Sequence, residues 1–183
     1  MKIEIAKTEI IHFVGIGGIG MSGLSLIIKG KGFKVQGSDL SLNKNIERLK
    51  KEKIKIFIGQ KKQNLKDATI VVVSSAIKKN NPEIIEAKRK NLPIIKRGKM
   101  LAHIVSLMKN IVVVGSHGKT TTTSLITSIF QTTKIDPTII NGGVINSINN
   151  TAKLGKSDWS ILEADESDAV SYTHLTLPTK RIV

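Results

Sequence analysis

The chain of 183 residues is predicted to adopt an α/β fold built on mostly parallel sheets. Short apolar runs typical of buried strands alternate with helical patterns along the chain. A glycine-rich turn follows the first apolar run, and a second glycine turn follows the run that begins at Ile111. Each turn leads into a helical pattern, which is the order found in nucleotide-binding α/β domains. These observations predict two successive α/β units.

The first unit is predicted from alternating strand-like and helix-like segments. Thr69–Ser74 (TIVVVS) is a continuous apolar run, typical of a strand buried on both faces. Pro82 suits the first turn of a helix, where its missing N–H leaves no hydrogen bond unmade. Strands are expected at Ile10–Val14, Lys34–Gly37, Ile54–Ile58, Thr69–Ser74 and Leu92–Lys96. Helices are expected on both faces of the sheet, at Gly18–Gly30, Asn43–Lys51, Pro82–Lys90 and Gly98–Met108.

The pattern restarts at Ile111, so a domain boundary is placed near Lys109–Asn110. The run IVVVG is expected to be a buried strand that leads into a helix within SHGKTTTTSLITSIF. Further strands are expected at Asp136–Ile140 and Trp159–Glu163. The chain thus divides into a Rossmann-like domain at residues 1–108 and the start of a P-loop-type α/β ATPase domain at residues 109–169.

The last fourteen residues do not continue this pattern. The segment VSYTHLTLPT resembles the conceptual translation of a sequencing adapter, so residues 170–183 are expected to be a non-native read-through tail after Ala169. The alternative is a genuine strand and loop at the end of the chain. Tyr172 and His174 are given no functional role.

Composition limits the function classes that are open. The net charge of +15 allows a nucleic-acid-binding module, but only four of the 29 basic residues are arginine and aromatic residues make up only 3%. The lysines are scattered, which favours solvated helix faces and phosphorylated small-molecule ligands over nucleic acid. There is no cysteine for a disulfide, no apolar run that could span a bilayer and no signal peptide. A cytoplasmic protein without membrane insertion is expected.

The first motif lies between the first strand and the first helix. Its glycines let backbone N–H groups approach a diphosphate at the helix N-terminus; they are Gly15, Gly17, Gly18 and Gly20. Asp39, at the end of the second strand, could accept hydrogen bonds from a ribose hydroxyl. Taken alone, these residues predict a dinucleotide-type domain and would suggest NAD. A tight turn without a ligand is the alternative.

The second motif predicts a site for ATP phosphates. It consists of Gly115, Ser116, His117, Gly118, Lys119, Thr120 and Thr121. Backbone amides and the Lys119 ammonium can hold phosphates, while the Thr120 hydroxyl can ligate Mg²⁺. The spacing is shorter than in the general P-loop, whose first glycine is replaced here by Val113. His117 either contacts phosphate or substrate, or stabilises the turn.

A third element is a strand that ends in carboxylates. Glu163 lies at the end of this strand and is the stronger candidate for an Mg²⁺ ligand, together with Thr120. Asp165, Glu166 and Asp168 follow it without an assigned role. An ordinary acidic surface turn is the alternative reading.

The combined motifs resemble those of the Mur ligases, and most closely those of the L-alanine-adding members. The matching segments are HFVGIGGIGMSGL, GSDL, VVVSSAI, NPEI, GSHGKTTTT, NGG and EADESDA. They occur in the family's order and cover Lys2–Ala169; Ser116 departs from the family's usual threonine.

The resemblance implies a three-domain, ATP- and Mg²⁺-dependent ligase of peptidoglycan precursor synthesis, and hence of cell-wall biogenesis, cell shape and cell division. Such an enzyme joins L-alanine to the lactyl carboxylate of UDP-N-acetylmuramate through an acyl phosphate. The first glycine loop would then hold UDP rather than NAD. The implied UDP-substrate contacts are Gly15, Gly17, Gly18, Gly20, Asp39, Ser74, Ser75, Asn141 and Gly142.

The resemblance also implies catalytic roles for Lys119 and Glu163, with Thr120 and Glu163 as metal ligands. A sister ligase that adds a preformed peptide remains an alternative, and an NAD-dependent oxidoreductase is a weaker one. The family's amino-acid-binding domain would follow Ala169, so the chain alone is expected to be a truncated, inactive fragment. The strand at Ile111–Val114 and its neighbours are expected to lack sheet partners and to leave an apolar edge exposed.

Overall fold

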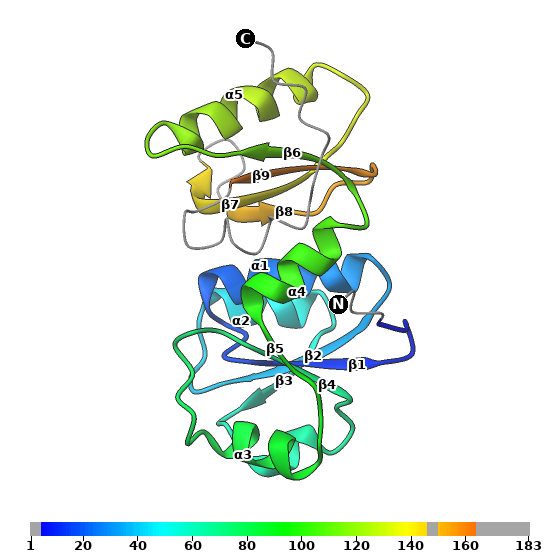
Figure 1. The fold of residues 1–183 in the computed structure, drawn as a ribbon, viewed down its shortest axis with the longest axis vertical. Helices are drawn as coiled ribbons and strands as arrows, with labels where there is room; N and C mark the ends of the chain where they lie inside the picture. Colours follow the sequence, from blue (N-terminus) through cyan, green and yellow to red (C-terminus); the bar gives the residue numbers. More distant parts are fainter. Residues whose placement is uncertain (1–4, 146–149, 164–183) are drawn as a thin grey trace.

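The computed structural model describes residues 5–145 and 150–163. Within this part the chain forms two sheets, one above the other, with helices between them (Figure 1). The first sheet is wholly parallel and has the order β3-β2-β1-β4-β5. Its strands are β1 (Ile10–Val14), β2 (Lys34–Asp39), β3 (Lys55–Ile58), β4 (Ile70–Val73) and β5 (Ile94–Lys96). The second sheet, of order β6-β9-β7-β8, contains β6 (Lys109–Val113), β7 (Thr138–Ile145), β8 (Asn150–Lys153) and β9 (Trp159–Glu163).

The helices cover both faces of the first sheet, as the sequence predicts for a parallel sheet. The helices are α1 (Ile19–Gly30), α2 (Lys44–Lys51), α3 (Pro82–Arg89), α4 (Arg97–Val105) and α5 (Lys119–Gln131), with a 3₁₀ turn η1 at Lys62–Leu65. Figure 1 shows α1 and α4 between the two sheets, α3 on the far face of the first sheet, and α5 on the outer face of the second. The predicted fold class, two successive α/β units, is confirmed.

Alternating side chains of β1 explain why both faces of this sheet need cover. Ile11 and Phe13 point into the core beneath α1 and α4, and both are fully buried. Val14 points to the opposite face and packs in a second cluster with Ile84 of α3. His12 is also fully buried on a strand, so the central strand presents no face to solvent.

Short polar side chains set where two of these helices begin. The Asn43 side chain accepts a hydrogen bond from the Ile46 N–H and thereby caps α2. Asn81 does the same for α3, where it accepts from the N–H groups of Glu83 and Ile84. Pro82 follows directly at the first helical position, as expected from its fixed φ.

The pairing of β6, at the edge of the second sheet, differs from what the sequence predicts. β6 was expected to lack sheet partners, but it pairs in parallel with β9 over five residues, from Lys109↔Trp159 to Val113↔Glu163. That expectation was wrong because this chain already contains the apolar run of β9, which supplies the partner strand. In the described order β6 is nevertheless the end strand, and Val114 just beyond it is 69% exposed.

A short connection joins the two sheets. α4 ends at Val105 and β6 begins at Lys109. The Asn110 side chain donates to the carbonyls of Val105 and Met108, at 3.0 and 2.9 Å, and so fixes this connection. In the described part of the chain, no helix combines the length and apolarity needed to cross a membrane.

Candidate functional site

The first group of candidate residues gathers at the carboxyl edge of the first sheet. The glycine turn follows β1, Asp39 is the last residue of β2, and Ser74 and Ser75 directly follow β4. The strand order places β2 and β4 on opposite sides of β1. The connections from β1 through β3 therefore run toward one side of the sheet, and the later connections run toward the other. Ligands of open parallel sheets bind in the crevice outside this switch point. The structure thus brings these three segments to one edge.

The glycine turn is held by the neighbouring strand. Gly15 has a positive φ of 77°, which a residue with a side chain rarely adopts. The N–H groups of Gly15 and Ile16 both donate to the Ser38 carbonyl, at 2.8 and 2.9 Å. Gly18 then caps α1 without any side-chain hydrogen bond. The first-turn N–H groups of α1 therefore remain available to an anion.

Asp39 contacts the turn itself. Its carboxylate accepts from the Gly17 N–H and from the Leu40 N–H, both at 2.8 Å. The Asn45 side chain donates to the Gly17 carbonyl at 2.8 Å. A Cβ on Gly17 would lie only 2.9 Å from Asp39 Oδ2 and 2.7 Å from Asn43 Nδ2. Asp39 therefore closes the glycine turn, a contact that the sequence motif does not reveal.

Arg97 is a further candidate residue, which the sequence does not single out. It is the first residue of α4, directly after β5, so it lies at the same edge of the sheet. Its guanidinium packs on α1, with Nη1 only 3.2 Å from the position of a Cβ on Gly20. Its place after a predicted strand, among only four arginines, is the signal that could have identified it.

The second group of candidate residues lies at the carboxyl edge of the second sheet. The segment from Gly115 to Gly118 forms the turn between β6 and α5, with φ values of 153° and 75° at these two glycines. Gly118 is the N-cap of α5 in the left-handed conformation. The Lys119 ammonium donates to the Gly115 carbonyl at 2.8 Å and folds back over the turn.

Thr120 and Glu163, 43 residues apart, meet at this edge. The Thr120 hydroxyl lies 3.3 and 3.2 Å from the two carboxylate oxygens of Glu163. Neighbouring oxygens of an octahedral Mg²⁺ site, with bonds of about 2.1 Å, are about 2.9 Å apart. A small movement would therefore let both side chains ligate one ion. Among the described residues no group of three or more acidic, His or Cys side chains could hold a metal. Two protein ligands suit Mg²⁺, which keeps waters and substrate phosphates in its shell.

The remaining candidate residues lie in β7, near the start of α5, or outside the described residues. Asn141 and Gly142, which are predicted UDP-substrate contacts, lie within β7 and follow Ile140, which pairs with Leu162 of β9. Ser116, His117 and Thr121 lie on the turn or first helical turn before and within α5. Asp165, Glu166, Asp168 and the expected tail at residues 170–183 lie outside the described residues.

Sequence comparison identifies relatives over the whole chain. Residues 10–109 match a sequence model described as "Mur ligase family, catalytic domain". The UDP-N-acetylmuramate–L-alanine ligase of Pelagibacter ubique is 74% identical over 183 residues, which is all of this chain and 39% of that protein. The protein of the same name from Brucella ovis is 48% identical over 178 residues, 97% of this chain and 37% of that protein. The chain thus spans about two fifths of these relatives' length.

Solved structures share the fold. The UDP-N-acetylmuramate:L-alanyl-gamma-D-glutamyl-meso-diaminopimelate ligase from Neisseria meningitides matches 87% of this chain and 53% of its own, with a TM-score of 0.74 and 28% identity. The UDP-N-acetylmuramate-alanine ligase from Thermotoga maritima matches 84% of this chain and 36% of its own, with a TM-score of 0.72 and 31% identity. Both similarities extend across the two sheets, because 84–87% of the chain cannot lie within either sheet alone.

Proposed function

The chain belongs to the Mur ligase family, and from this membership we propose that it forms the UDP-substrate site and the start of the ATP site of a ligase. The complete reaction would join L-alanine to the lactyl carboxylate of UDP-N-acetylmuramate in the cytoplasm, with ATP cleaved to ADP and phosphate. The observation that carries this proposal is the pair of glycine turns, each at the carboxyl ends of the parallel strands of its own sheet. A single-nucleotide enzyme would need only one such turn.

The first edge suits the diphosphate of a UDP-sugar. The open N–H groups of α1 and the guanidinium of Arg97 offer positive charge at one place. The NAD alternative needs the acid at the end of β2 to accept hydrogen bonds from a ribose. Here each oxygen of Asp39 accepts one backbone N–H group and keeps a lone pair, so Asp39 does not discriminate between the two ligands. Membership of the Mur ligase family favours UDP over NAD, with Ser74 and Ser75 as further contacts.

The second edge suits the phosphates of ATP. In the proposed reaction the lactyl carboxylate attacks the γ-phosphate, and the amine of L-alanine then displaces phosphate from the acyl phosphate. Two anions must approach each other in the first step, so catalysis depends on positioning and charge neutralisation. Lys119 contributes one positive charge, and Thr120 with Glu163 would hold the Mg²⁺ that offsets the phosphate charge.

The direct test is ligand binding by the 183-residue chain. We expect isothermal titration calorimetry to detect UDP-N-acetylmuramate binding, UDP competition with it, and no binding of NAD under the same conditions. Tight NAD binding without UDP-sugar binding would instead support the oxidoreductase alternative. A nucleic-acid duplex titrated at two salt concentrations tests the remaining alternative that rests on charge.

Arg97→Ala is expected to weaken UDP-N-acetylmuramate binding about tenfold, because a charge-assisted contact to the diphosphate is lost. Calorimetry on the 183-residue chain measures this. Lys99→Ala, at an exposed position of the same helix, is the control and should bind normally. Equal affinities of the two variants would remove Arg97 from the site.

Thr120→Val is expected to lower the Mg²⁺-dependent affinity for ATP about tenfold, since one oxygen ligand is replaced by a methyl group. The measurement is ATP binding with Mg²⁺ and with EDTA, in a protein of the relatives' full length that carries this chain. Thr122→Val is the matched control, because this exposed threonine lies on the same helix and contacts no acid in the described structure. If Thr120→Val kept the full Mg²⁺ effect, Thr120 would not be a metal ligand.

A peptide-adding ligase is the second candidate, favoured by the structural match to the Neisseria protein. The identity of 74% to an L-alanine ligase favours the first candidate. ADP release by the longer protein, measured with L-alanine and separately with a tripeptide that begins with L-alanine, discriminates between them.

A further inference from the structure

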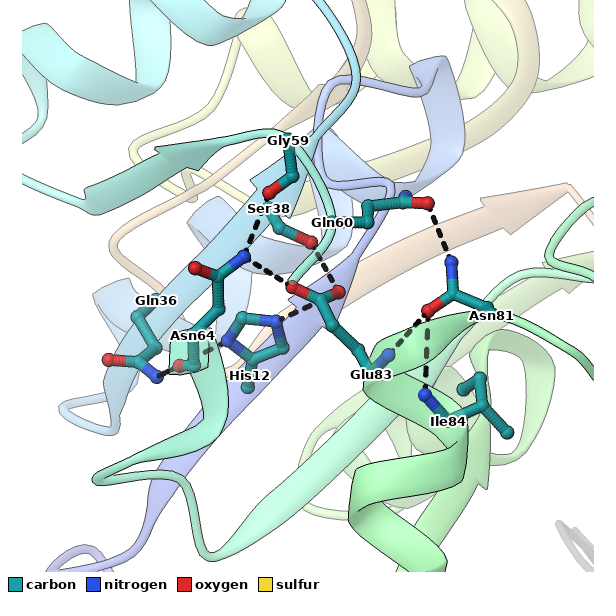
Figure 2. Close-up of polar contacts among 9 residues, drawn as sticks. All are labelled: His12, Gln36, Ser38, Gly59, Gln60, Asn64, Asn81, Glu83 and Ile84. Atoms are coloured by element: carbon teal, nitrogen blue, oxygen red, sulfur yellow. Dashed lines mark hydrogen bonds and ion pairs between the residues drawn. The ribbon is translucent and has the colours of Figure 1, made fainter. Parts of the chain in front are cut away.

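A buried polar cluster lies beneath the glycine turn, on the α3 face of the first sheet (Figure 2). We define it as His12 of β1, Gln36 and Ser38 of β2, Asn64 of η1 and Glu83 of α3; their exposed fractions are between 0% and 7%. Burial of so many polar groups is costly unless each finds a partner. The proposed chemistry assigns no role to any of these side chains.

Glu83 is the centre of the cluster. The Ser38 hydroxyl donates to its Oε2 at 2.6 Å, and the Asn64 amide donates to its Oε1 at 2.6 Å. His12 Nε2 lies 3.5 Å from Oε2. Figure 2 shows these three groups converging on the carboxylate from two strands and the 3₁₀ turn.

The groups around Glu83 favour a carboxylate at this position. Gln36 Nε2 donates to the Asn64 carbonyl at 3.0 Å, which fixes the orientation of its amide group. The same nitrogen lies 3.2 Å from His12 Nδ1, so Nδ1 accepts and the ring proton is on Nε2. Ser38 and Asn64 donate hydrogen bonds to Glu83, while His12 Nε2 faces Oε2 at 3.5 Å without a hydrogen bond. A glutamine would replace one carboxylate oxygen with an N–H₂ group and remove the charge of the acceptor that these donors contact.

The cluster reaches the glycine turn through Ser38. Its hydroxyl is held by Glu83, and its carbonyl accepts the N–H groups of Gly15 and Ile16. One residue thus connects the buried carboxylate to the backbone of the turn. Tilting the peptide of Ser38 would move both of these N–H groups.

A second connection runs through Asn64. Its amide also donates to the Gly59 carbonyl at 2.8 Å, and the Gly59 N–H donates to the Asp39 carbonyl at 2.7 Å. Asp39 in turn holds Gly17. Both connections therefore begin at Glu83 and end on the glycine turn, through the adjacent residues Ser38 and Asp39 of β2.

We propose that Glu83 is a positioning residue of the UDP-substrate site, which sets the glycine turn through Ser38 and Asn64 without touching the ligand. This inference rests on the proposed function for the identity of the ligand. α3 also begins soon after the Ser74–Ser75 segment, and Ile77 between them packs 3.2 Å from the Cβ position of Gly15. Glu83 thus joins the glycine turn to the helix that follows the second proposed substrate segment.

The test compares Glu83→Gln and Ser38→Ala with Glu86→Gln in the 183-residue chain. Glu86 is the matched control, because it is a 9% exposed glutamate of the same helix that binds only Arg89 in the described structure. Two quantities are measured at a temperature where every variant is folded: hydrogen exchange of the Gly15 and Ile16 amides by NMR, and affinity for UDP-N-acetylmuramate.

Glu83→Gln is expected to speed exchange of the Gly15 and Ile16 amides and to weaken UDP-N-acetylmuramate binding about tenfold, as loss of a charge-assisted hydrogen bond does. Ser38→Ala, which removes one hydroxyl and preserves packing, should act in the same direction, and the double variant should be little worse than Glu83→Gln alone. Glu86→Gln should change neither quantity.

The outcomes separate the two proposals. Unchanged amide exchange in both Glu83→Gln and Ser38→Ala would overturn the positioning role, whatever the chain binds. Faster exchange with unaltered UDP-sugar affinity would overturn it as well, since the turn would not matter to the ligand. Failure of the unsubstituted chain to bind the UDP-sugar would overturn the proposed function, while the exchange measurement would still decide whether Glu83 sets the turn.

Discussion

Lys119→Ala is expected to lower the rate of ligation about 10²–10³-fold, in a protein of the relatives' full length that carries this chain. Lys119 begins α5, and its ammonium lies over the turn, where it donates to the Gly115 carbonyl. In the proposed reaction the Lys119 ammonium contacts the ATP phosphates as the substrate carboxylate approaches. Its removal leaves the repulsion between two anions uncompensated in the transition state. Release of ADP, followed in a coupled assay, measures the effect.

The affinity for UDP-N-acetylmuramate should be unchanged in Lys119→Ala, because the UDP-substrate edge belongs to the other sheet. Lys50→Ala, an exposed lysine of α2, is the control for general charge effects and should keep normal turnover. A Lys119→Ala enzyme with near-normal ADP release would contradict the role of Lys119, and with it the assignment of the second glycine turn to ATP.

Phe13→Ala is expected to reduce the free energy of unfolding by about 3–5 kcal/mol, the usual effect of emptying a large buried aromatic site. Phe13 is fully buried at the centre of the first sheet, between β2 and β4 and beneath the helices. This loss is a large share of the about 5–15 kcal/mol that a typical domain possesses. Urea denaturation of the chain, followed by circular dichroism, measures it.

Ile85→Ala provides the comparison, since this α3 side chain is 55% exposed. It should change the free energy of unfolding by less than about 0.5 kcal/mol. Similar losses in the two variants would mean that the core does not lie where the structure places it.

Most strands could be predicted from the sequence because their residues are apolar and end at recognisable breaks. β1 and β9 begin and end at the predicted residues, Ile10–Val14 and Trp159–Glu163. β8 was not predicted, because Asn150–Lys153 (NTAK) has no apolar pattern. It is a strand through its antiparallel pairing with β7, and such a contact leaves no local signal.

The candidate site likewise contains residues that could be predicted from the sequence and residues that could not. The glycine turns and the Thr120–Glu163 pair could be proposed because strand ends on one edge of a parallel sheet are brought together by the fold class itself. Arg97 and Glu83 could not, because their importance lies in contacts with Gly20 and Ser38, distant in sequence. From the sequence, Glu83 is only an acid in the first turn of a helix, and Asp39 only an acid at a strand end.

The strands of the first sheet all come from an early part of the chain, which affects how the protein folds as it leaves the ribosome. Its five strands in the described structure all come from Ile10–Lys96, and none of them waits for a partner from the second sheet. The strands of this unit can therefore pair co-translationally while Trp159–Glu163 is still unsynthesised, and Leu162 of β9 joins the core of this unit afterwards. By contrast β6 pairs with residues of β9 that lie fifty positions later, so the nascent second unit stays open until that strand leaves the exit tunnel.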